Sequence, residues 1–475
     1  MLSVQDLVDI SEKESYIYEN ININALCFDS RLCKEGDAFF CFVGQEANGH
    51  KYINQAVENG AKIIVSQDKN IEILPGLSYI FTDDSRLLYA KASYYFFKDE
   101  IKDLKIIGIT GTDGKSSTAY YTYQLLKSFN YKCALFSTVY TDNGTGLELS
   151  KYSQSTPDAF YIFSFLAESA KNNVDYFVQE ATSHALSEKL ERLYGLNYIT
   201  SSYTAVSSEH LEFHKTIENY YKTKARLQEK TIGKTYILQD NKILPYLKNK
   251  DLEIIEKPTF KTQALNSSTF IYGNKEYVFS SGYSFALENA FLAAWMTQYI
   301  TNYDISIIFE KLKDLKQVKG RMQSYLYKDN INIIIDFAHT ANSFYCLFSQ
   351  LKKMYPGSDI MSVFSSSGQR DKDKRYYMAK VADDFTSQII LTEDDPRNES
   401  FKSICDDLLK GITNKDKVII IEDRKEAIKK ALTSAKANSI ICLLGKGHQT
   451  SMYKGFESVR YSEEETLLKL MQENG

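Results

Sequence analysis

The residues best suited to chemistry lie at 108–117, which read Gly-Ile-Thr-Gly-Thr-Asp-Gly-Lys-Ser-Ser. This segment follows an apolar run over 104–109 and precedes a helical pattern over 118–129. Glycines let backbone N–H groups point inward, and the first turn of a helix adds partial positive charge. Lys115 would reach the β- and γ-phosphates of a nucleotide, and Ser116 would offer its hydroxyl to Mg²⁺. The order predicts a phosphate-binding loop; a glycine turn with a chance lysine is the alternative.

Further polar residues follow the predicted strands. Glu180 ends an apolar run over 176–179, and ligands of open α/β sheets bind at the carboxyl ends of strands. A carboxylate at this place can hold the Mg²⁺ that accompanies a nucleotide, although a solvated loop glutamate is the alternative. One histidine is more often structural than catalytic, but all six here have a glycine, carboxylate or hydroxyl close by, which favours a functional role for several. These are His50, His184, His210, His214, His339 and His448.

Three charged segments are ambiguous on composition alone. Residues 220–227 form an amphipathic helix with a basic face, for which solvated lysines are the default interpretation. Residues 370–375 follow a strand and either bind phosphate or form a solvated loop. In 394–399, proline stiffens the turn and presents Arg397 at a defined angle, and arginine forks suit carboxylates. An N-capped turn is the alternative for this last segment.

Length and composition limit the class of protein. A chain of 475 residues predicts about three domains, and 43% hydrophobic residues support sizeable cores. The net charge of −4 argues against a nucleic-acid partner held by a basic face. No run of 18 apolar residues and no signal-peptide pattern is present, so no membrane partner is expected. Seven cysteines without a CxxC pair predict reduced thiols and a cytoplasmic location.

Alternation of strands and helices divides the chain into three predicted α/β blocks, 1–98, 99–321 and 322–475. Apolar strands that alternate with helices imply parallel sheets covered on both faces. The predicted strands are 38–43, 62–65, 78–81, 104–109, 176–179, 198–205, 331–335, 359–364, 388–391, 417–421 and 439–444. The predicted helices are 52–59, 86–97, 118–129, 186–194 and 217–230.

These segments, in this order, resemble the Mur ligase family, most closely the branch that adds the third peptide residue to UDP-N-acetylmuramoyl-L-alanyl-D-glutamate (here, the UDP-muramoyl dipeptide). The resemblance runs from Cys27 to Glu464, nearly the whole chain. It implies an N-terminal UDP-binding domain over 1–98, a central P-loop ATP-binding domain with a parallel sheet over 99–321, and a C-terminal Rossmann-like domain for the amino acid over 322–475. It also implies an ATP-dependent C–N ligase that works through an acyl phosphate in peptidoglycan precursor synthesis.

The resemblance assigns residues to each ligand, with the substrates being the UDP-muramoyl dipeptide and a free diamino acid. The implied ATP-binding residues are Gly111, Thr112, Asp113, Gly114, Lys115, Ser116, Ser117, Asn289, Arg321, Asp336 and His339. Those implied for the UDP-muramoyl dipeptide are Ser30, Arg31, Gly49, His50, Ser155, Thr156, Pro157, Ser183 and Arg192. Those implied for the amino acid are Arg370, Asp394, Asp395, Arg397, Gly445 and Gln449.

The resemblance also implies a metal site and a modified lysine. Lys115, His210 and Lys224 are the implied catalytic residues, and Lys224 matches a lysine that the family carbamylates with CO₂ to N6-carboxylysine. An ammonium near two Mg²⁺ would repel them, whereas a carbamate is an anion. The implied metal ligands are Ser116, Glu180, His210 and Lys224.

Several positions depart from the family pattern. Glu188 and Leu190 replace the usual Gln and Arg that contact the muramoyl peptide, and Arg192 can substitute from two positions further on. Ala286 replaces the first Asn of a nucleotide-contacting helix, and Ala341 stands where the family usually has Pro. We expect an active enzyme because the ATP and metal positions are retained.

Two rival functions and the third amino acid stay open. Another Mur-type ligase, such as a folylpolyglutamate synthetase, is disfavoured by the N-terminal Asp29-Ser-Arg31 domain, and retention of the ATP and metal residues disfavours a non-catalytic scaffold. Family enzymes that use meso-diaminopimelate typically carry Asn at position 395 and Glu at 449, where this chain has Asp395 and Gln449. This difference slightly favours L-lysine or L-ornithine, while Arg397 keeps diaminopimelate possible. A monomer is expected.

Overall fold

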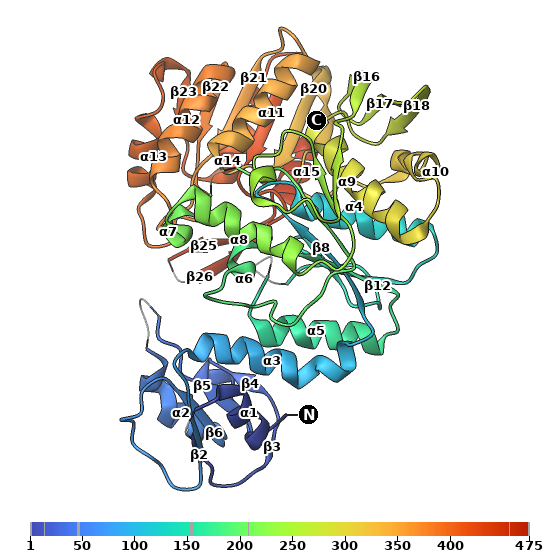
Figure 1. Cartoon of the computed structure of the whole chain (residues 1–475). Helices are drawn as coiled ribbons and strands as arrows, with labels where there is room; N and C mark the ends of the chain where they lie inside the picture. Colours follow the sequence, from blue (N-terminus) through green and yellow to red (C-terminus); the bar gives the residue numbers. More distant parts are fainter. Residues whose placement is uncertain are drawn as a thin grey trace. The chain divides into compact units, whose positions relative to one another are not determined.

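The computed structural model describes residues 2–13, 15–44, 48–151, 156–207, 209–455 and 457–473. The chain folds into two compact units, each assembled from several segments. The first comprises Met1–Gly111, Leu126–Tyr203 and His214–Ile254, and the second comprises Thr112–Leu125, Thr204–Phe213 and Ile255–Gly475. Strands and helices alternate in both (Figure 1), which confirms the predicted α/β class.

The N-terminal part of the first unit is a five-stranded sheet in the order β2-β7-β6-β5-β4. Strands β4 to β7 are parallel, and β2 is an antiparallel edge strand. Its core includes the fully buried Phe39, Ile64 and Tyr79. The strands are β2 (Ser15–Tyr16), β4 (Leu26–Cys27), β5 (Ala38–Phe40), β6 (Ile63–Ser66) and β7 (Ser78–Phe81), beside the pair β1 (Leu2–Ser3) and β3 (Asn22–Ile23). The helices are α1 (Val4–Ser11), α2 (Ile53–Glu58) and α3 (Ser85–Ile101).

An eight-stranded sheet follows, in the order β11-β10-β9-β12-β8-β13-β14-β15. The strands from β9 to β14 in this order are parallel, but the edge strands β10 and β11 are antiparallel, so the predicted all-parallel sheet is correct only for the centre. The strands are β8 (Lys105–Thr110), β9 (Cys133–Phe136), β10 (Tyr140–Asp142), β11 (Glu148–Leu149), β12 (Tyr176–Glu180), β13 (Thr200–Tyr203), β14 (Thr235–Leu238) and β15 (Leu252–Ile255).

Helices α3 and α5 pack side by side in the first unit (Figure 1). The helix predicted over 186–194 is wrong, because α6 ends at Leu186 and turns follow it. Ser187 leaves the helical conformation with ψ 141°, so the chain does not continue as a helix after Leu186. The helices after α3 are α4 (Lys115–Ser128), α5 (Ala159–Lys171), α6 (Ser183–Leu186), α7 (Leu211–His214) and α8 (Ile217–Glu229).

The second unit contains a three-stranded antiparallel sheet and a six-stranded sheet. The first has the order β16-β17-β18 and packs against α9 (Ser284–Thr301) through Phe270 and Phe291, whose rings lie 5.2 Å apart. The second has the order β19-β20-β24-β21-β22-β23, with β19 antiparallel and the others parallel. The strands are β16 (Thr259–Ala264), β17 (Ser267–Tyr272), β18 (Lys275–Phe279), β19 (Gln323–Tyr327), β20 (Ile331–Asp336), β21 (Ile360–Phe364), β22 (Gln388–Leu391), β23 (Val418–Ile420) and β24 (Ile440–Leu444).

Helices cover both faces of the six-stranded sheet, as predicted. Ile428 of α14 and Leu467 of α15 share a core with Val363 on one face. On the other face, Phe344 of α11 meets Phe364 of β21 at a ring distance of 5.1 Å. The helices are α9 (Ser284–Thr301), α10 (Ile305–Phe309), α11 (Ala341–Met354), α12 (Asp373–Phe385), α13 (Phe401–Leu409), α14 (Arg424–Ser434) and α15 (Glu463–Glu473), and the hairpin β25 (Ser451–Lys454) and β26 (Glu457–Arg460) precedes α15.

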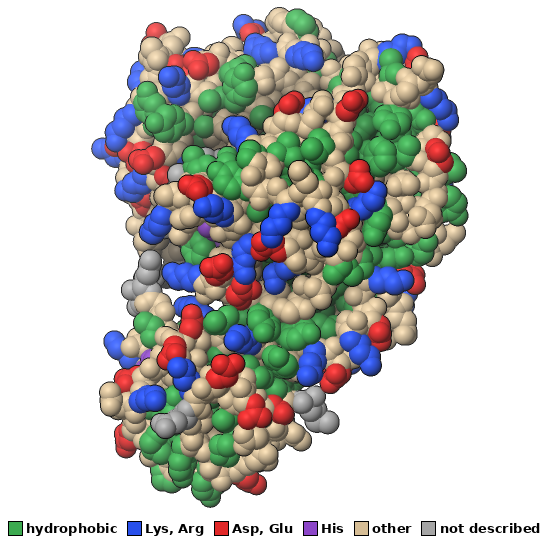
Figure 2. Space-filling view, in the orientation of Figure 1, with side chains coloured by type: hydrophobic (Ala, Val, Ile, Leu, Met, Phe, Trp, Pro, Cys, Tyr) green, Lys and Arg blue, Asp and Glu red, His purple; other side chains and the backbone are tan. Residues whose placement is uncertain are grey.

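The surface in Figure 2 carries basic and acidic side chains interspersed rather than gathered in one basic area. Within the described residues, no helix combines the length and apolar character that a membrane crossing requires. All seven cysteines are free thiols, and six of them are buried.

Candidate active site

The phosphate-binding loop joins β8, which ends at Thr110, to α4, which begins at Lys115. Gly114 has φ +90°, a conformation that favours glycine. A Cβ at this position would lie 2.4 Å from Oδ1 of Asn289 on α9, so only glycine lets the two segments approach this closely. The structure therefore brings together two residues that the sequence analysis assigned separately to the nucleotide.

The loop is held by the segment that follows β13. The backbone N–H groups of Thr112 and Asp113 both donate to Ala205 O, at 2.8 and 3.2 Å. The Thr112 hydroxyl donates to Ser207 O at 3.0 Å, and Lys115 Nζ donates to Thr112 O at 2.8 Å. These contacts fix the loop and hold the ammonium of Lys115 over it, next to the buried Ser116.

Glu209 connects two of the predicted histidines in the second unit. Its carboxylate oxygens lie 3.6 Å from Nε2 of His210 and 3.7 Å from Nε2 of His339. Burial acts to raise the pKa of Glu209, but the hydrogen bond with His339 and the electrostatic influence of His210, His339 and Lys115 outweigh it, so the pKa lies below its usual value. His210 has φ +56°, which is unusual outside glycine and is typical of functional sites.

Asp336 ends β20 and Arg321 precedes β19, so both lie at the carboxyl edge of the six-stranded sheet. The buried carboxylate of Asp336 accepts from the N–H of Met322 and of Ala338, both at 2.7 Å. Burial raises its pKa, while the nearby charge of Arg321 opposes this rise. Arg321 lies over the Phe337 ring at 4.6 Å. These contacts give Asp336 a fixed orientation at the end of β20.

Glu180 ends β12 in the first unit, at the carboxyl edge predicted for it. It is fully buried, and its two oxygens accept from the N–H of Thr138 at 2.7 Å and from the Thr138 hydroxyl at 3.1 Å. Glu180 is the parallel register partner of Ile109, one residue before β8 ends. Glu180 therefore lies at the end of β12, next to the end of β8 from which the phosphate-binding loop departs.

Lys224 on α8 is buried, with 2% of its surface exposed, in contrast to the solvated lysine expected by default from composition. Its Nζ donates to Gly111 O at 2.7 Å and lies 4.7 Å from the centre of the Tyr220 ring. A buried ammonium needs such partners because desolvation is costly. Lys224 is thus placed against the first glycine of the phosphate-binding loop.

The segment predicted to contact the muramoyl peptide is held to β12 and to the following turn. Thr156 Oγ1 donates to Glu180 O at 3.3 Å, and Arg192 donates to Thr156 O at 2.6 Å. The buried Ser183 hydroxyl lies 3.0 Å from His214 Nε2. Ser155, predicted for the same role, lies outside the described residues.

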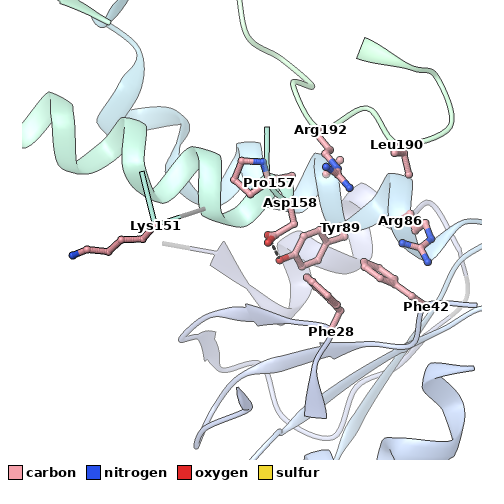
Figure 3. A pocket seen from close by; sticks show the side chains of 11 residues that line it. Phe28, Phe42, Arg86, Tyr89, Lys151, Pro157, Asp158, Leu190 and Arg192 are labelled. Atoms are coloured by element: carbon pink, nitrogen blue, oxygen red, sulfur yellow. Dashed lines mark hydrogen bonds between the residues drawn. The ribbon is translucent and has the colours of Figure 1, made fainter. Parts of the chain in front are cut away.

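A pocket of about 400 Å³ opens in the first unit (Figure 3). Pro157 and Arg192, both predicted for the UDP-muramoyl dipeptide, line it together with Leu190. The volume is within the range of small-molecule sites. Its other lining residues, which the sequence analysis did not select, are Phe28, Phe42, Arg86, Tyr89, Ala90, Lys151, Asp158 and Ala159.

The four predicted residues of the N-terminal sheet do not line this pocket. Arg31 forms a two-pronged ion pair with Asp29, at 2.8 and 2.6 Å. The Ser30 hydroxyl donates to Gln55 at 2.6 Å. His50 contacts Asn48 and Ser66, and a Cβ on Gly49 would lie 2.7 Å from the backbone of Phe42. These contacts lie within the domain itself.

The residues predicted for the amino acid meet at the carboxyl ends of β22 and β24. Lys446, which is fully buried, places its Nζ 2.8 Å from Asp395 Oδ1 and 3.4 Å from Asp394 Oδ1. Asp395 also accepts from the N–H of Tyr453 at 3.0 Å. Gly445 must be glycine, because it has φ +101° and its Cβ would lie 2.9 Å from Asp394 Oδ2.

The residues predicted for the amino acid also include Arg397, Arg370 and Gln449. Arg397 has φ +55°, and its N–H donates to Tyr453 O at 3.1 Å, so β25 holds its backbone in this strained conformation. Arg370 is exposed, and the N–H of Gln449 donates to Lys446 O at 3.0 Å. Four buried polar atoms after the carboxyl ends of β21, β22 and β24 have no hydrogen-bond partner among the described residues: Ser365 Oγ, Ser366 Oγ, Asp394 Oδ1 and His448 Nδ1. A bound ligand or ordered water could supply partners for these atoms.

His448 is neutral at ordinary pH. Burial, with the positive charges of Arg321, Lys446 and Lys319, lowers its pKa to about 3. Gly320 lets the loop of His448 approach, because a Cβ there would lie 2.0 Å from the His448 backbone nitrogen. An uncharged imidazole can donate or accept a hydrogen bond without adding charge to the site.

A buried ion pair ties the two loops of the amino-acid site together. Arg375 is fully buried and donates to both oxygens of Glu399, at 2.7 and 2.8 Å, and to Asp407 at 3.0 Å. Glu399 also accepts from the N–H of Gln369, next to Arg370. Hydrogen bonds from Arg375 lower the pKa of Glu399, although its burial opposes this.

We expect Glu399→Gln to lower the free energy of unfolding by about 3 kcal/mol at pH 7, because it leaves Arg375 without its main partner. A carboxyl group with a lowered pKa stabilises the fold above its unfolded pKa of about 4.5 and loses this effect as the pH falls. The difference between the variant and the wild type should therefore shrink below pH 4.5. Urea denaturation at several pH values measures it.

The matched control is Glu218→Gln, which breaks an exposed ion pair with Lys222 and should leave the midpoint of urea denaturation unchanged. Equal stability of the Glu399 variant and the wild type at pH 7 would contradict the role of the pair.

The predicted metal ligands are divided between the two units. Among the described residues, no three His, Cys, Asp or Glu side chains lie together in a way that could hold an ion. Glu180 and Lys224 belong to the first unit, and Ser116 and His210 belong to the second. Ser116 and Glu180 supply oxygen donors, which is the donor type that Mg²⁺ prefers.

Two functional candidates were missed by the sequence analysis. Glu209 directly precedes the selected His210 in the sequence, and this adjacency was the available signal. Lys446 lies in the segment Gly445–His448, but nothing in the sequence indicates that its ammonium reaches Asp395. The pocket residues Phe28 and Arg86 gave no signal, because they lie far apart in the sequence.

Comparison with known proteins agrees with this arrangement. Family models match the chain for the Mur ligase catalytic domain over 22–99, the Mur ligase middle domain over 109–296 and the Mur ligase glutamate ligase domain over 320–447. The chain is 35% identical over 471 residues to the UDP-N-acetylmuramyl-tripeptide synthetase of Borreliella afzelii, covering 94% of this chain and 93% of that protein.

It is also 31% identical over 475 residues to the UDP-N-acetylmuramoyl-L-alanyl-D-glutamate–2,6-diaminopimelate ligase of Clostridium tetani, covering 95% of this chain and 96% of that protein. A solved structure of a ligase with the same name has a TM-score of 0.61 at 23% identity, over 98% of this chain and 99% of that one, which shows a common fold. The matched domains define an ATP-dependent ligase that forms an amide bond. The chain belongs to the Mur ligase family.

Proposed function

We propose that this chain joins a diamino acid to the UDP-muramoyl dipeptide while ATP is converted to ADP and phosphate, in cytoplasmic synthesis of peptidoglycan precursors. The observation that carries the proposal is the phosphate-binding loop with Lys115 over it and Asn289 against Gly114, in a chain that matches tripeptide synthetases along nearly its full length. We further propose a monomer with a UDP-binding domain over 1–98, an ATP domain over 99–321 and an amino-acid domain over 322–475.

The reaction has two chemical steps. The terminal carboxylate of the dipeptide attacks the γ-phosphorus of ATP, the bond to ADP breaks, and an acyl phosphate forms. The amine of the diamino acid then attacks the acyl carbon, and the tetrahedral intermediate expels phosphate while the amine loses a proton. Phosphoryl transfer needs positioning and charge neutralisation more than covalent chemistry. Lys115 supplies positive charge at the transferred group.

Mg²⁺ is the cation proposed at this site, where it neutralises phosphate charge. Ser116, Glu180, His210 and Lys224 would hold it, with Lys224 carrying a carbamate formed from CO₂. Glu209 orients His210 and His339 through its carboxylate, which lies within 3.7 Å of both rings.

The remaining residues are assigned to ATP and to the two other substrates by their positions in the chain. The ATP residues are proposed as Gly111, Thr112, Asp113, Gly114, Lys115, Ser116, Ser117, Asn289, Arg321, Asp336 and His339. The UDP-muramoyl dipeptide is assigned to Ser30, Arg31, Gly49, His50, Ser155, Thr156, Pro157, Ser183 and Arg192. The amino acid is assigned to Arg370, Asp394, Asp395, Arg397, Gly445 and Gln449.

A product assay tests the function. The purified chain is incubated with UDP-muramoyl dipeptide, ATP, Mg²⁺ and single amino acids, and products are identified by mass. A UDP-muramoyl tripeptide is the expected product, formed only with the dipeptide present. Phosphate release without a peptide product would leave a generic nucleotidase. Turnover of a folate substrate, or nucleotide binding with no turnover at all, would support one of the two rival functions instead.

The third amino acid should be L-lysine or L-ornithine by a small margin. Asp395 would attract a distal ammonium and repel the far carboxylate of meso-diaminopimelate. Lys446 already compensates much of this charge at 2.8 Å, so the expected preference is no more than about tenfold, or about 1.4 kcal/mol. Equimolar L-lysine, L-ornithine and meso-diaminopimelate in one reaction, with products separated by mass, measure the ratio.

The matched variant is Asp395→Asn, which removes the anion and should shift the product ratio toward diaminopimelate. A wild-type product that contains mainly diaminopimelate would overturn the preference and leave the family assignment intact.

A further inference from the structure

The pocket of the first unit has a wall that the assignments above leave without a role. Phe28 and Phe42 stack with ring centres 5.0 Å apart, and the Tyr89 ring meets both edge-on, at 5.7 and 5.4 Å. Figure 3 shows these three rings on one side of the pocket, with Arg192 and Leu190 above them. This aromatic cluster gives the pocket an apolar side, against which a ring or a sugar of a ligand can pack.

Arg86, from the first turn of α3, places a guanidinium beside this wall. Its Cζ lies 4.5 Å from the centre of the Phe42 ring. Stacking uses the face of the guanidinium and leaves its N–H edges available for a ligand. Burial lowers the pKa of Arg86, and the nearby carboxylate of Asp84 opposes this shift.

Arg192 brings a second guanidinium to the same pocket. It donates to Thr156 O at 2.6 Å, and its pKa is lowered by burial and further by the charge of Arg86. Asp158 opposes this shift, but its Oδ1 already accepts from the Tyr89 hydroxyl at 2.8 Å and from the N–H of Tyr161 at 3.3 Å. Two partly buried guanidinium groups therefore line the same pocket, beside a carboxylate that already accepts two other hydrogen bonds.

Lys151, the third basic residue of the pocket, lies apart from the two arginines. Its ammonium lies 3.5 Å from Glu148, and Figure 3 shows its side chain pointing away from the two arginines. Leu190 lines the pocket at the position where the family pattern implies an arginine. The charge absent at Leu190 is thus supplied in the same pocket by Arg86 and Arg192.

We propose that Arg86 and Arg192 form an anion-binding subsite for the UDP-muramoyl dipeptide, beside a wall of Phe28, Phe42 and Tyr89. This inference rests on the proposed function. The anion is either the diphosphate or a carboxylate of the terminal glutamyl residue, since guanidinium groups bind both through paired N–H donors.

Calorimetric binding to the full chain tests the proposal with uridine, UDP and UDP-muramoyl dipeptide as probes. Arg86→Met and Arg192→Met should each weaken UDP-muramoyl dipeptide about 10- to 100-fold and leave uridine unchanged, because hydrogen bonds to charged groups contribute about 1.5–3 kcal/mol. Lys98→Met, which removes an exposed cation from the same helix, is the matched control and should change nothing.

The two anion sources give different results. If the diphosphate is bound, UDP weakens as much as the whole substrate; if the carboxylate is bound, UDP is unaffected and only the dipeptide substrate weakens. Unchanged affinity for both probes in both variants would overturn the proposal. If Arg86→Met does not fold, Arg86→Lys replaces it in the test. Arg86→Lys keeps a cation and should retain part of the affinity. A folded Arg86→Met variant with full wild-type affinity would contradict the proposal.

Ligation and binding separate this inference from the proposed function. In the product assay, the arginine variants should raise the KM for UDP-muramoyl dipeptide and leave the KM for ATP unchanged. Ligation with an unchanged substrate KM would remove the subsite and retain the function. Arginine-dependent binding of the probes without any ligation would retain the subsite and remove the function.

Discussion

Replacement of Lys115 by alanine is expected to reduce ligation by about 100-fold or more. Lys115 Nζ lies over the phosphate-binding loop, 2.8 Å from Thr112 O, and no other cation of the loop itself can neutralise the transferred phosphoryl group. Because this charge develops in the chemical step, the loss should fall mainly on kcat. Formation of the tripeptide product, measured by mass at saturating ATP, gives the result.

The control for this variant is Lys127→Ala, an exposed lysine at the other end of α4, which should ligate at the wild-type rate. Thermal denaturation establishes that both variants are folded. Turnover by the Lys115 variant above about a tenth of the wild-type rate would sink the assignment of this lysine to the phosphoryl group.

Apolar strands between helices were the most predictable part of the fold. Strands β7 (Ser78–Phe81) and β22 (Gln388–Leu391) begin and end at the predicted residues, because both are buried apolar runs. The phosphate-binding loop was equally accessible, since its strand, glycines and helix are contiguous in the sequence. Local signals of this kind need no knowledge of tertiary contacts.

The sequence did not predict the strands β16 and β17, nor the turns after α6. The strands lack an expected local pattern, whereas the turns occur where a helical pattern is present. β16 (Thr259–Ala264) is polar and mostly exposed, so it lacks the apolar run of a central strand. Residues 186–194 have helical apolar spacing, but Ser187 and Glu191 leave the helix, and Glu191 has φ +41°. In the structure Glu191 forms an ion pair with Arg226, a partner 35 residues away. A tertiary contact here overrides the local pattern.

Charge compensation at the site was also inaccessible to the sequence. The argument about the third amino acid treats Asp395 as an isolated anion. The structure places the ammonium of Lys446, 51 residues away, at 2.8 Å from it. The effective charge at this position is therefore smaller than the residue type suggests. Distances of this kind follow from the order of β22, β21 and β24 in the sheet, which periodicity does not specify.

Replacement of Lys224 by alanine should also reduce ligation by about 100-fold or more, for a different reason. If Lys224 acts as a carbamate, alanine removes an anion that would hold Mg²⁺, and added short carboxylates such as acetate should restore part of the activity. Depletion of CO₂ should inhibit the wild type and leave the rescued variant unaffected. Rates at several acetate concentrations measure the effect.

The structure offers a second role for Lys224, and the same experiment separates the two. Its ammonium donates to Gly111 O at 2.7 Å, so it also supports the backbone of the phosphate-binding loop as a cation. Lys224→Arg keeps a cation but cannot form a stable carbamate. If Lys224→Arg is active and acetate does not rescue Lys224→Ala, the cationic role is favoured. Lys222→Ala, on the same helix but exposed and paired with Glu218, should be fully active. Full activity of unrescued Lys224→Ala would remove both roles and reduce the buried lysine to packing.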